Sequence, residues 1–240
     1  MRIAVLSDIH SNLVALEAVL AHLGTVDAVW HLGDVVGYGP EPDAVVERLA
    51  SIGAIGVRGN HDAAAAGGSE IDYFNPEARA AMEWTRRRIT DTTRDWLAAL
   101  PERRVERDIT MVHGSPRDPI WEYVTSLAVA RAGIAVMTTT LGLHGHTHMP
   151  IAFAVTDARL EVTAPSDGTT LELEDRVALV NPGSVGQPRD GDARASYLVL
   201  DPERRTIDWH RVGYDIEAVV TAMHAAGLPD RLAERLHHGV

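Results

Sequence analysis

The stretch Ile3-Ala4-Val5-Leu6-Ser7-Asp8-Ile9-His10 is an apolar run that ends in polar residues. A stretch with leucine and valine at helical spacing follows it, over Leu13–Leu23. Two more apolar runs, Ala28–Trp30 and Ala54–Val57, flank a second helical stretch around Val45–Leu49. This order of strand, helix, strand, helix and strand predicts parallel βαβ units.

The next section, from Asp62 to Glu106, predicts a helical insertion that caps the α/β body, at about residues 63–106. Asn75-Pro76-Glu77 is typical of a helix start, because proline suits the first helical position and an acid suits the first turn. Pro101 is expected to end a second, shorter helix. The alanine- and glycine-rich stretch Ala63–Ser69 is expected to be a mobile loop.

Beyond His148 the apolar residues alternate with period 2, which predicts antiparallel strands. The expected strands are Ile151–Val155, Arg159–Thr163, Thr169–Leu173, Val177–Val180, Ala195–Leu200 and Thr206–Val212. Asp167-Gly168 indicates a hairpin, Asp215–Ala226 a closing helix, and His237–Val240 a loose tail. Two sheets stacked face to face with helices outside, in one domain over residues 1–240, follow from this pattern.

The composition excludes several classes of site. The 240 residues include 34 acidic side chains against 22 basic ones, a net charge of -12 that disfavours stable binding to duplex nucleic acid. Without cysteine there are no thiolate metal sites, and without lysine no Walker-type phosphate loop. An acid as early as Asp8, and no apolar run near the roughly 20 residues of a membrane span, predict a cytoplasmic protein. The sequence leaves the oligomeric state open, and a homo-oligomer is one of the alternatives.

Five short polar clusters each follow an apolar run. They are Asp8-Ile9-His10, Gly33-Asp34, Gly59-Asn60-His61-Asp62, His113-Gly114 and Gly145-His146-Thr147-His148. Ligands bind at the carboxyl ends of strands in open α/β sheets, so five such ends can converge on one crevice. If strand geometry continues, alternate residues such as Asp8 and His10 point to one side. The glycines before the polar residues indicate sharp turns or close backbone approach.

Seven side chains in these clusters are candidate metal ligands. They are Asp8, His10, Asp34, Asn60, His113, His146 and His148. Imidazole nitrogens with carboxylate and amide oxygens suit Mn, Fe, Co, Ni or Zn, whereas an all-oxygen site suits Mg or Ca. Seven ligands are too many for one tetrahedral ion and fit two divalent ions that share a carboxylate. Two carboxylates, a bridging hydroxide and a singly charged phosphodiester would balance the four positive charges.

The pattern D-x-H…GD…GNHD…H…GHTH resembles the signature of the calcineurin-like metallophosphoesterases over residues 1–150. Asn181–Arg189 resembles the tail motif of the small bacterial phosphodiesterase branch, which extends the resemblance to about residue 200. The resemblance implies a four-layer α/β/β/α sandwich with two mixed sheets. That expectation agrees with the pattern of strands and helices.

The resemblance also implies roles for the ligands. One metal would bind Asp8, His10, Asp34 and His148, and the other Asp34, Asn60, His113 and His146, with Asp34 as the bridge. His61 matches the residue that contacts phosphate and protonates the leaving group. Asp34 and Asn60 join His61 as expected catalytic residues, and Asn60, His61, Arg58 and Tyr38 are the expected substrate contacts.

The sequence departs from the family pattern at two positions. Tyr38 stands four residues after the bridging aspartate, where Ser/Thr protein phosphatases and symmetrical dinucleoside tetraphosphatases have arginine. His144 stands where the family usually has an apolar residue. It is either a structural histidine or a residue that orients the ligand His146. For Arg58 the sequence leaves two roles open, a phosphate contact and an ion pair with a neighbouring acid. Tyr38 and Tyr123 are both candidate pocket walls.

The predicted function is a two-metal hydrolase that cleaves small phosphorylated substrates, phosphodiesters above all. A metal-bridging hydroxide would attack phosphorus, with His61 as general acid. The alternatives are a phosphomonoesterase, like the Ser/Thr protein phosphatases or dinucleoside polyphosphatases, and a non-catalytic scaffold of the same fold. A nuclease is disfavoured on duplex DNA by the net charge.

Overall fold

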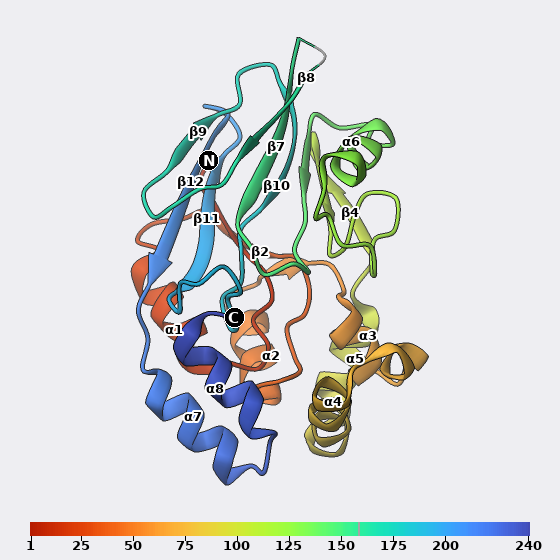
Figure 1. Cartoon of the computed structure of the whole chain (residues 1–240), viewed down its shortest axis with the longest axis vertical. Coiled ribbons are helices and arrows are strands. Elements are labelled where there is room, and N and C mark those ends of the chain that lie inside the picture. The colour runs from red at the N-terminus through yellow and green to blue at the C-terminus, as the bar shows by residue number, and fades with distance from the viewer. Residues whose placement is uncertain (158) are drawn as a thin grey trace.

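Two six-stranded sheets form the centre of the computed structural model, which describes residues 1–157 and 159–240 (Figure 1). The strands are β1 (Ile3–Leu6), β2 (Ala28–His31), β3 (Ile55–Gly56), β4 (Arg103–Glu106), β5 (Ile109–Val112), β6 (Leu141–Leu143), β7 (Ile151–Thr156), β8 (Arg159–Thr163), β9 (Thr170–Glu172), β10 (Val177–Asn181), β11 (Ala195–Asp201) and β12 (Thr206–Val212). The helices are α1 (Leu13–His22), α2 (Pro42–Ser51), α3 (Asn60–Ala65), α4 (Pro76–Arg88), α5 (Asp91–Ala99), α6 (Leu127–Ala135), α7 (Ile216–Ala225) and α8 (Asp230–His238), with a 3-10 helix η1 (Ser69–Tyr73). Within the described residues, no helix is long and apolar enough to cross a membrane.

Both sheets are mixed, as predicted. The first has the order β3-β2-β1-β11-β12-β9, in which β1, β2 and β3 are parallel and the rest pair antiparallel. The second has the order β4-β5-β6-β10-β7-β8, with β5, β6 and β10 parallel. The βαβ units expected over the first 60 residues are therefore present.

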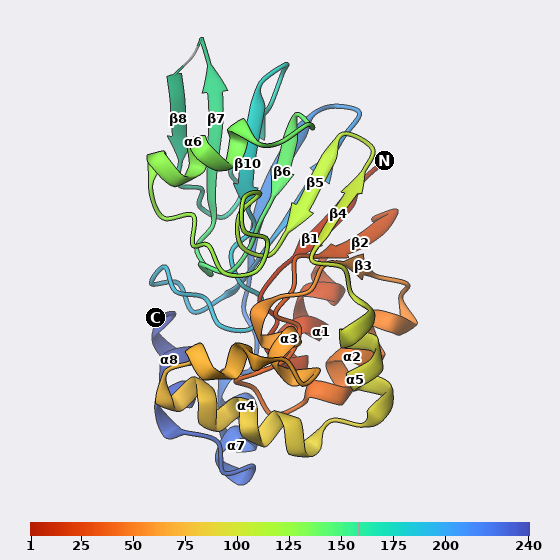
Figure 2. The same cartoon turned by 90° about the vertical axis from the view of Figure 1, so that its right-hand side faces the viewer.

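Strand β1 is apolar throughout because both of its faces are buried. Ile3 and Val5 pack in the core between the two sheets, with Met111 of the second sheet. Ala4 and Leu6 point the other way, into a core shared with α1 and α2. On the opposite side of the molecule α6 covers the second sheet (Figure 2). These packing relations give the four layers α/β/β/α.

The helical insertion is present, with two corrections to its predicted course. Asn75 caps α4 by accepting from the amide of Ala78, as the start signal predicts. The expected loop Ala63–Ser69 is wrong at its beginning, because α3 continues to Ala65 and small alanine side chains let it pack in the core. The end of the insertion is also different, since Arg103–Glu106 pairs with β5 as an edge strand.

Two expectations for the second half are corrected by the structure, and one helix was missed. Asp167-Gly168 does not form a hairpin, because β8 pairs with β7 in the second sheet and β9 with β12 in the first. The predicted loose tail His237–Val240 is helical in its first half: His237 and His238 end α8, whose Leu232 and Leu236 pack in a cluster with α7. Helix α6 was not predicted.

Candidate metal centre

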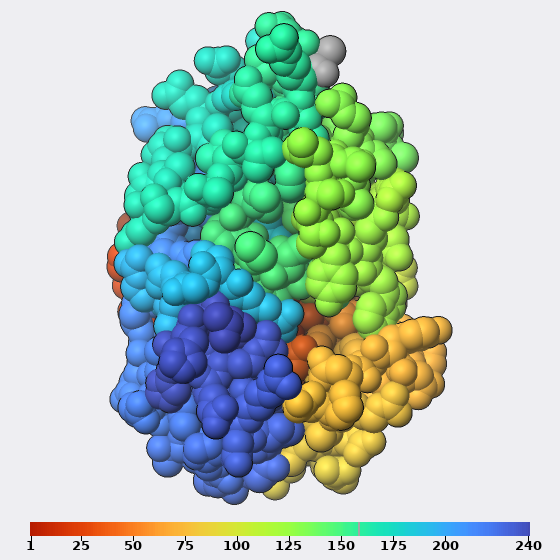
Figure 3. Space-filling model, in the orientation of Figure 1, coloured from red at the N-terminus to blue at the C-terminus, as the bar shows by residue number. Residues whose placement is uncertain are grey.

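The seven predicted ligands meet beyond the carboxyl ends of five strands. Asp8 and His10 follow β1, Asp34 follows β2, Asn60 follows β3, His113 follows β5, and His146 and His148 follow β6. Each is at most 4% exposed, so their polar atoms depend on one another or on a bound group. The surface is hollowed here, between the C-terminal helices in dark blue and the orange α3–η1 segment (Figure 3).

The backbone reaches this arrangement through left-handed turns. Five of the seven have positive φ: Asp8 (53°), His10 (50°), Asp34 (50°), His146 (65°) and His148 (59°). Strand geometry therefore does not continue after β1, because each left-handed residue changes the direction of the chain. Each such residue costs about 1–2 kcal/mol. Gly33 has φ 88°, and a Cβ there would lie 2.5 Å from the amide nitrogen of Gly59. The expected close approach at these glycines is confirmed.

The first donor cluster consists of Asp8, His10, Asp34 and His148, with one donor atom of each within 4.8 Å of the others. The Nε2 atom of His148 lies 3.3 Å from Oδ1 of Asp8. The Nε2 atom of His10 lies 3.7 Å from Oδ2 of Asp34. Oδ1 of Asp8 is buried and has no hydrogen-bond partner.

The second donor cluster consists of Asp34, His113 and His146, joined by Asn60. The Nε2 atom of His113 lies 3.3 Å from Oδ2 of Asp34 and 3.0 Å from Oδ1 of Asn60. It also lies 3.0 Å from Nδ1 of His146. Asp34 therefore belongs to both clusters, and His146 and His148 belong to different ones.

Backbone carbonyls orient all four histidines. They are the carbonyls of Val36 to His10 Nδ1 (3.2 Å), Leu32 to His113 Nδ1 (2.9 Å), Trp121 to His146 Nε2 (3.2 Å) and Gln187 to His148 Nδ1 (2.6 Å). A carbonyl oxygen only accepts, so each of these ring nitrogens donates, and in a neutral ring the other nitrogen presents a lone pair. The lone pairs on Nε2 of His10 and Nε2 of His148 then face each other at 3.1 Å. Such buried acceptors repel unless a cation lies between them, so the donor set fits metal ions.

The electrostatics agree with a donor role. Burial lowers the pKa of His10, His146 and His148 well below the usual 6.5, which leaves neutral imidazoles. Burial acts to raise the pKa of Asp34, but His113 and its other histidine neighbours hold it well below its usual range. His113 is the exception: burial lowers its pKa, and Asp34 more than offsets this and raises it to about 9. A metal that binds there displaces this proton.

The family of this chain follows from comparison with known proteins. A model described as the calcineurin-like phosphoesterase superfamily domain matches residues 1–205. The chain belongs to the calcineurin-like phosphoesterase superfamily. Because the family depends on divalent metals and acts on phosphorylated substrates, this phosphoesterase is a metal-dependent hydrolase whose buried Asp and His clusters can bind metal.

Relatives of this phosphoesterase cover most or all of its length. Its sequence is 43% identical to that of a metallophosphoesterase from Sphaerobacter thermophilus, with 100% of both chains covered. The crystal structure of that protein superposes on this one with a TM-score of 0.91. It is 36% identical to an uncharacterized protein of Methanocaldococcus jannaschii, over 99% of this chain and 98% of that one. Phosphodiesterase YfcE of Escherichia coli is 28% identical over 84% of this chain and 88% of YfcE.

His61 lies beside the donor clusters in an aromatic cage. Its ring is stacked on Phe74 at 4.4 Å between centroids and lies 4.5 Å from Tyr38 and 4.9 Å from His10. Its backbone amide donates to Oδ1 of Asp34 at 2.9 Å. Nδ1 is buried without a partner, and burial lowers the pKa of His61 to about 4.

The remaining candidates divide between the site and other parts of the fold. The guanidinium of Arg58 pairs with Glu102 at 3.1 Å and donates to the carbonyl of Ala98. These contacts favour the ion-pair alternative over the phosphate contact. Tyr123 stacks on His146 at 3.8 Å between centroids, as a pocket wall would. His144 is fully buried, and burial lowers its pKa to about 3, in keeping with the structural alternative.

Two supporting residues were not assigned from the sequence. Asp62 is buried and accepts from the amides of Val35 and Val36 with one oxygen and from Gly59 with the other. It joins the loop after β2 to the loop after β3. Ser7 donates to Oδ2 of Asp8 at 2.6 Å. Asp62 lies in the quoted GNHD motif, which is the signal that could have revealed it.

The tail motif Asn181–Arg189 is hydrogen-bonded to the loops that carry the metal-ligand candidates. Asn181 donates to the carbonyl of Gly145 at 2.7 Å, and Ser184 donates to the carbonyl of Asp8 at 2.7 Å. Arg189, at the end of the motif, lies 3.5 Å from the hydroxyl of Tyr38 and 5.8 Å above its ring. Its guanidinium is therefore close to the wall that Tyr38 forms.

Proposed function

We propose that this phosphoesterase hydrolyses phosphodiesters with two divalent transition-metal ions, Mn, Fe, Co, Ni or Zn. The observation that supports two ions is the position of Asp34, whose carboxylate belongs to both donor clusters. One ion would be held by Asp8, His10, Asp34 and His148, and the other by Asp34, Asn60, His113 and His146. When bound, the ions lower the pKa of water and neutralise charge on the phosphoryl oxygens.

The side chains around the metals would bind the phosphoryl group and move a proton. Asn60 directs its amide oxygen toward His113, and its NH2 group can donate to a substrate oxygen. His61 would donate a proton to the leaving group from Nε2, because Nδ1 is buried against Gly37. With its pKa lowered to about 4, His61 needs the negative charge of the substrate to hold that proton.

The preference for diesters rests on Tyr38. A tyrosine at this position gives no guanidinium for the second charge of a monoester dianion, which is costly to bury unpaired. YfcE, a distant relative, is named a phosphodiesterase. Arg189 against the Tyr38 ring favours the second candidate, a phosphomonoesterase, because it brings one positive charge to the same wall. A non-catalytic scaffold is disfavoured by the complete set of seven donors and His61.

The decisive experiment is hydrolysis by metal-reconstituted protein of a panel of phosphodiesters and phosphomonoesters, with metal content measured on the same sample. The proposal expects two ions per chain and diester hydrolysis. Hydrolysis of monoesters alone supports the second candidate, and no hydrolysis of either class supports the scaffold. The cytoplasmic location and a homo-oligomer stay predictions of the sequence.

A further inference from the structure

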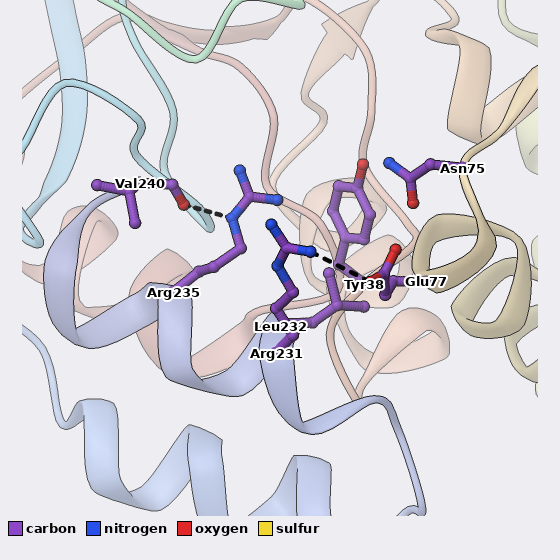
Figure 4. Close-up of a pocket in the computed structure, with 7 residues that line it drawn as sticks. All are labelled: Tyr38, Asn75, Glu77, Arg231, Leu232, Arg235 and Val240. Atoms are coloured by element: carbon purple, nitrogen blue, oxygen red, sulfur yellow. Dashed lines mark hydrogen bonds and ion pairs between the residues drawn. The ribbon is translucent and has the colours of Figure 1, made fainter.

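A cavity of about 420 Å³ has Tyr38 as part of its lining (Figure 4). Its walls come from three places that are distant in sequence: Tyr38, the start of α4 with Asn75 and Glu77, and the C-terminal segment with Arg231, Leu232, Arg235 and Val240. A volume of this size suits a small organic group. The cavity is polar, so the occupant must match the charges of its walls.

The charge at this cavity is positive although the protein is acidic. Arg231 and Arg235 line the cavity, and Arg189 reaches the hydroxyl of Tyr38 at 3.5 Å, so three guanidinium groups surround Tyr38. Two negative groups oppose them: the carboxylate of Glu77, 3.4 Å from Arg231, and the terminal carboxylate of Val240, which accepts from Arg235. The difference, three minus two, is +1 on a chain of net charge -12. Burial lowers the pKa of the half-buried Arg235, and the neighbouring charge of Arg189 lowers it further. Crowded cations of this kind stabilise a bound anion.

Tyr38 connects this cavity to the candidate metal centre. Its ring centroid lies 4.5 Å from that of His10 and 4.5 Å from that of His61, while the same residue lines the cavity. A phosphoester held at the metals would therefore have this cavity next to it. No residue of the cavity other than Tyr38 is used in the proposed chemistry.

We infer that this cavity binds a second phosphate of the substrate, so that the scissile phosphodiester belongs to a molecule with another phosphate group. The inference rests on the proposed function, because it adds a subsite to the same centre. Arginine is the residue suited to phosphate, since its planar fork donates two parallel hydrogen bonds to phosphate oxygens. A carboxylate has the same fork geometry and less charge, so the test includes one.

The test compares esters that differ only at the second group. Thymidine 5′-(p-nitrophenyl phosphate) presents one diester, and its derivatives phosphorylated or succinylated at the 3′ oxygen add a phosphate or a carboxylate. The metal-loaded enzyme should prefer the phosphorylated ester in kcat/KM by at least about tenfold, the size expected for hydrogen bonds to a charged group. Arg231→Gln and Arg235→Gln should each reduce this ratio, whereas Arg204→Gln, whose side chain is 83% exposed beside Asp201, should not. Arg231 is 76% exposed, so its replacement does not endanger the fold.

Equal kcat/KM for the three esters would overturn the inference while leaving the proposed function intact. A preference for the succinylated ester would overturn the assignment to phosphate. If no ester is cleaved, the proposed function fails, and the cavity is then tested by calorimetry with thymidine 3′,5′-bisphosphate against thymidine 5′-monophosphate. Tighter binding of the bisphosphate that weakens in Arg231→Gln supports the subsite, and equal binding rejects it.

Discussion

The Nε2 atoms of His10 and His148 lie 3.1 Å apart, and the other nitrogen of each ring donates to a backbone carbonyl. Folding thus places two buried lone pairs against each other from residues 138 positions apart in the sequence. This pair favours a cation between its members, so metal binding should stabilise the folded chain.

Removal of metal should lower the thermal stability, because ions that bind only the folded chain stabilise it by mass action. Protein purified without chelator should contain up to two ions per chain, about 3.5–4 Å apart, and should lose Tm on dialysis against chelator. Calorimetry and elemental analysis of the same samples check this. A fully loaded crystal with a single ion on three of these side chains would contradict it.

The shared position of Asp34 gives a sharper expectation. Asp34→Asn should reduce occupancy of both sites, since the carboxylate serves both clusters. His148→Ala and His113→Ala should each affect one site and leave the other. Elemental analysis of the three variants at equal free metal is the measurement. Full occupancy in Asp34→Asn would show that the aspartate does not bridge.

Asp62→Ala should destabilise the chain. The carboxylate accepts from the amides of Val35, Val36 and Gly59, and each buried donor left without a partner costs about 1–3 kcal/mol. The free energy of unfolding should therefore fall by about 3 kcal/mol or more. Urea unfolding measures it, with the exposed Asp95→Ala on α5 as control. An equal small change in both variants would refute the supporting role of Asp62.

His31 should make the fold sensitive to acid. It is fully buried, stacks on Trp96, and neither ring nitrogen has a partner, so burial lowers its pKa to about 3. Because the folded pKa is depressed, stability is present above pH 6.5 and is lost as the pH falls toward 3. Between pH 7 and pH 5, His31→Phe should gain about 2 kcal/mol relative to the natural chain.

Urea unfolding at the two pH values measures this difference, whatever the offset between the two proteins at pH 7. The same substitution at the exposed His224 is the control. If the difference between the natural chain and His31→Phe does not change with pH, the buried histidine does not control acid sensitivity.

The sequence predicted those features that depend on local pattern. The strands β1 to β3 and the helices between them follow from apolar spacing, and the polar residues after each strand marked the site. The pairing partners of the strands were harder to predict from the sequence. Asp167-Gly168 has the residues of a hairpin turn, yet β8 and β9 belong to different sheets. Long-range pairing decides that, and no local signal reports it.

The same limit applies within the site. The sequence indicated that Asp8 and His10 act together, but the left-handed backbone that aims them comes from tertiary packing of the loop. The ion pair of Arg58 with Glu102 depends on a residue 44 positions away. The terminal position of His237–Val240 predicts a loose tail, whereas burial of Leu232 and Leu236 stabilises α8 up to His238.

His61→Ala should lower kcat while the metal content stays close to that of the natural protein. The hydrogen bond from His61 to Asp34 comes from the backbone amide, which alanine retains. Loss of a general acid costs roughly 100- to 10,000-fold with an alkyl leaving group and less with p-nitrophenol, which needs little protonation. Kinetics with both leaving groups and elemental analysis test this. If the variant loses a metal, His61 is a ligand instead.

The preference between substrate classes depends on Tyr38. A bound diester adds one negative charge to the site and a monoester dianion adds two, and the second would be desolvated without the guanidinium that Tyr38 replaces. We therefore expect a higher kcat/KM for bis-(p-nitrophenyl) phosphate than for p-nitrophenyl phosphate at the same metal and pH. Tyr38→Arg should move the ratio toward the monoester. Arg189→Gln should move it further toward the diester, because the guanidinium of Arg189 lies 3.5 Å from the Tyr38 hydroxyl and above its ring. A clear monoester preference in the natural chain that survives Arg189→Gln would reject the role of Tyr38.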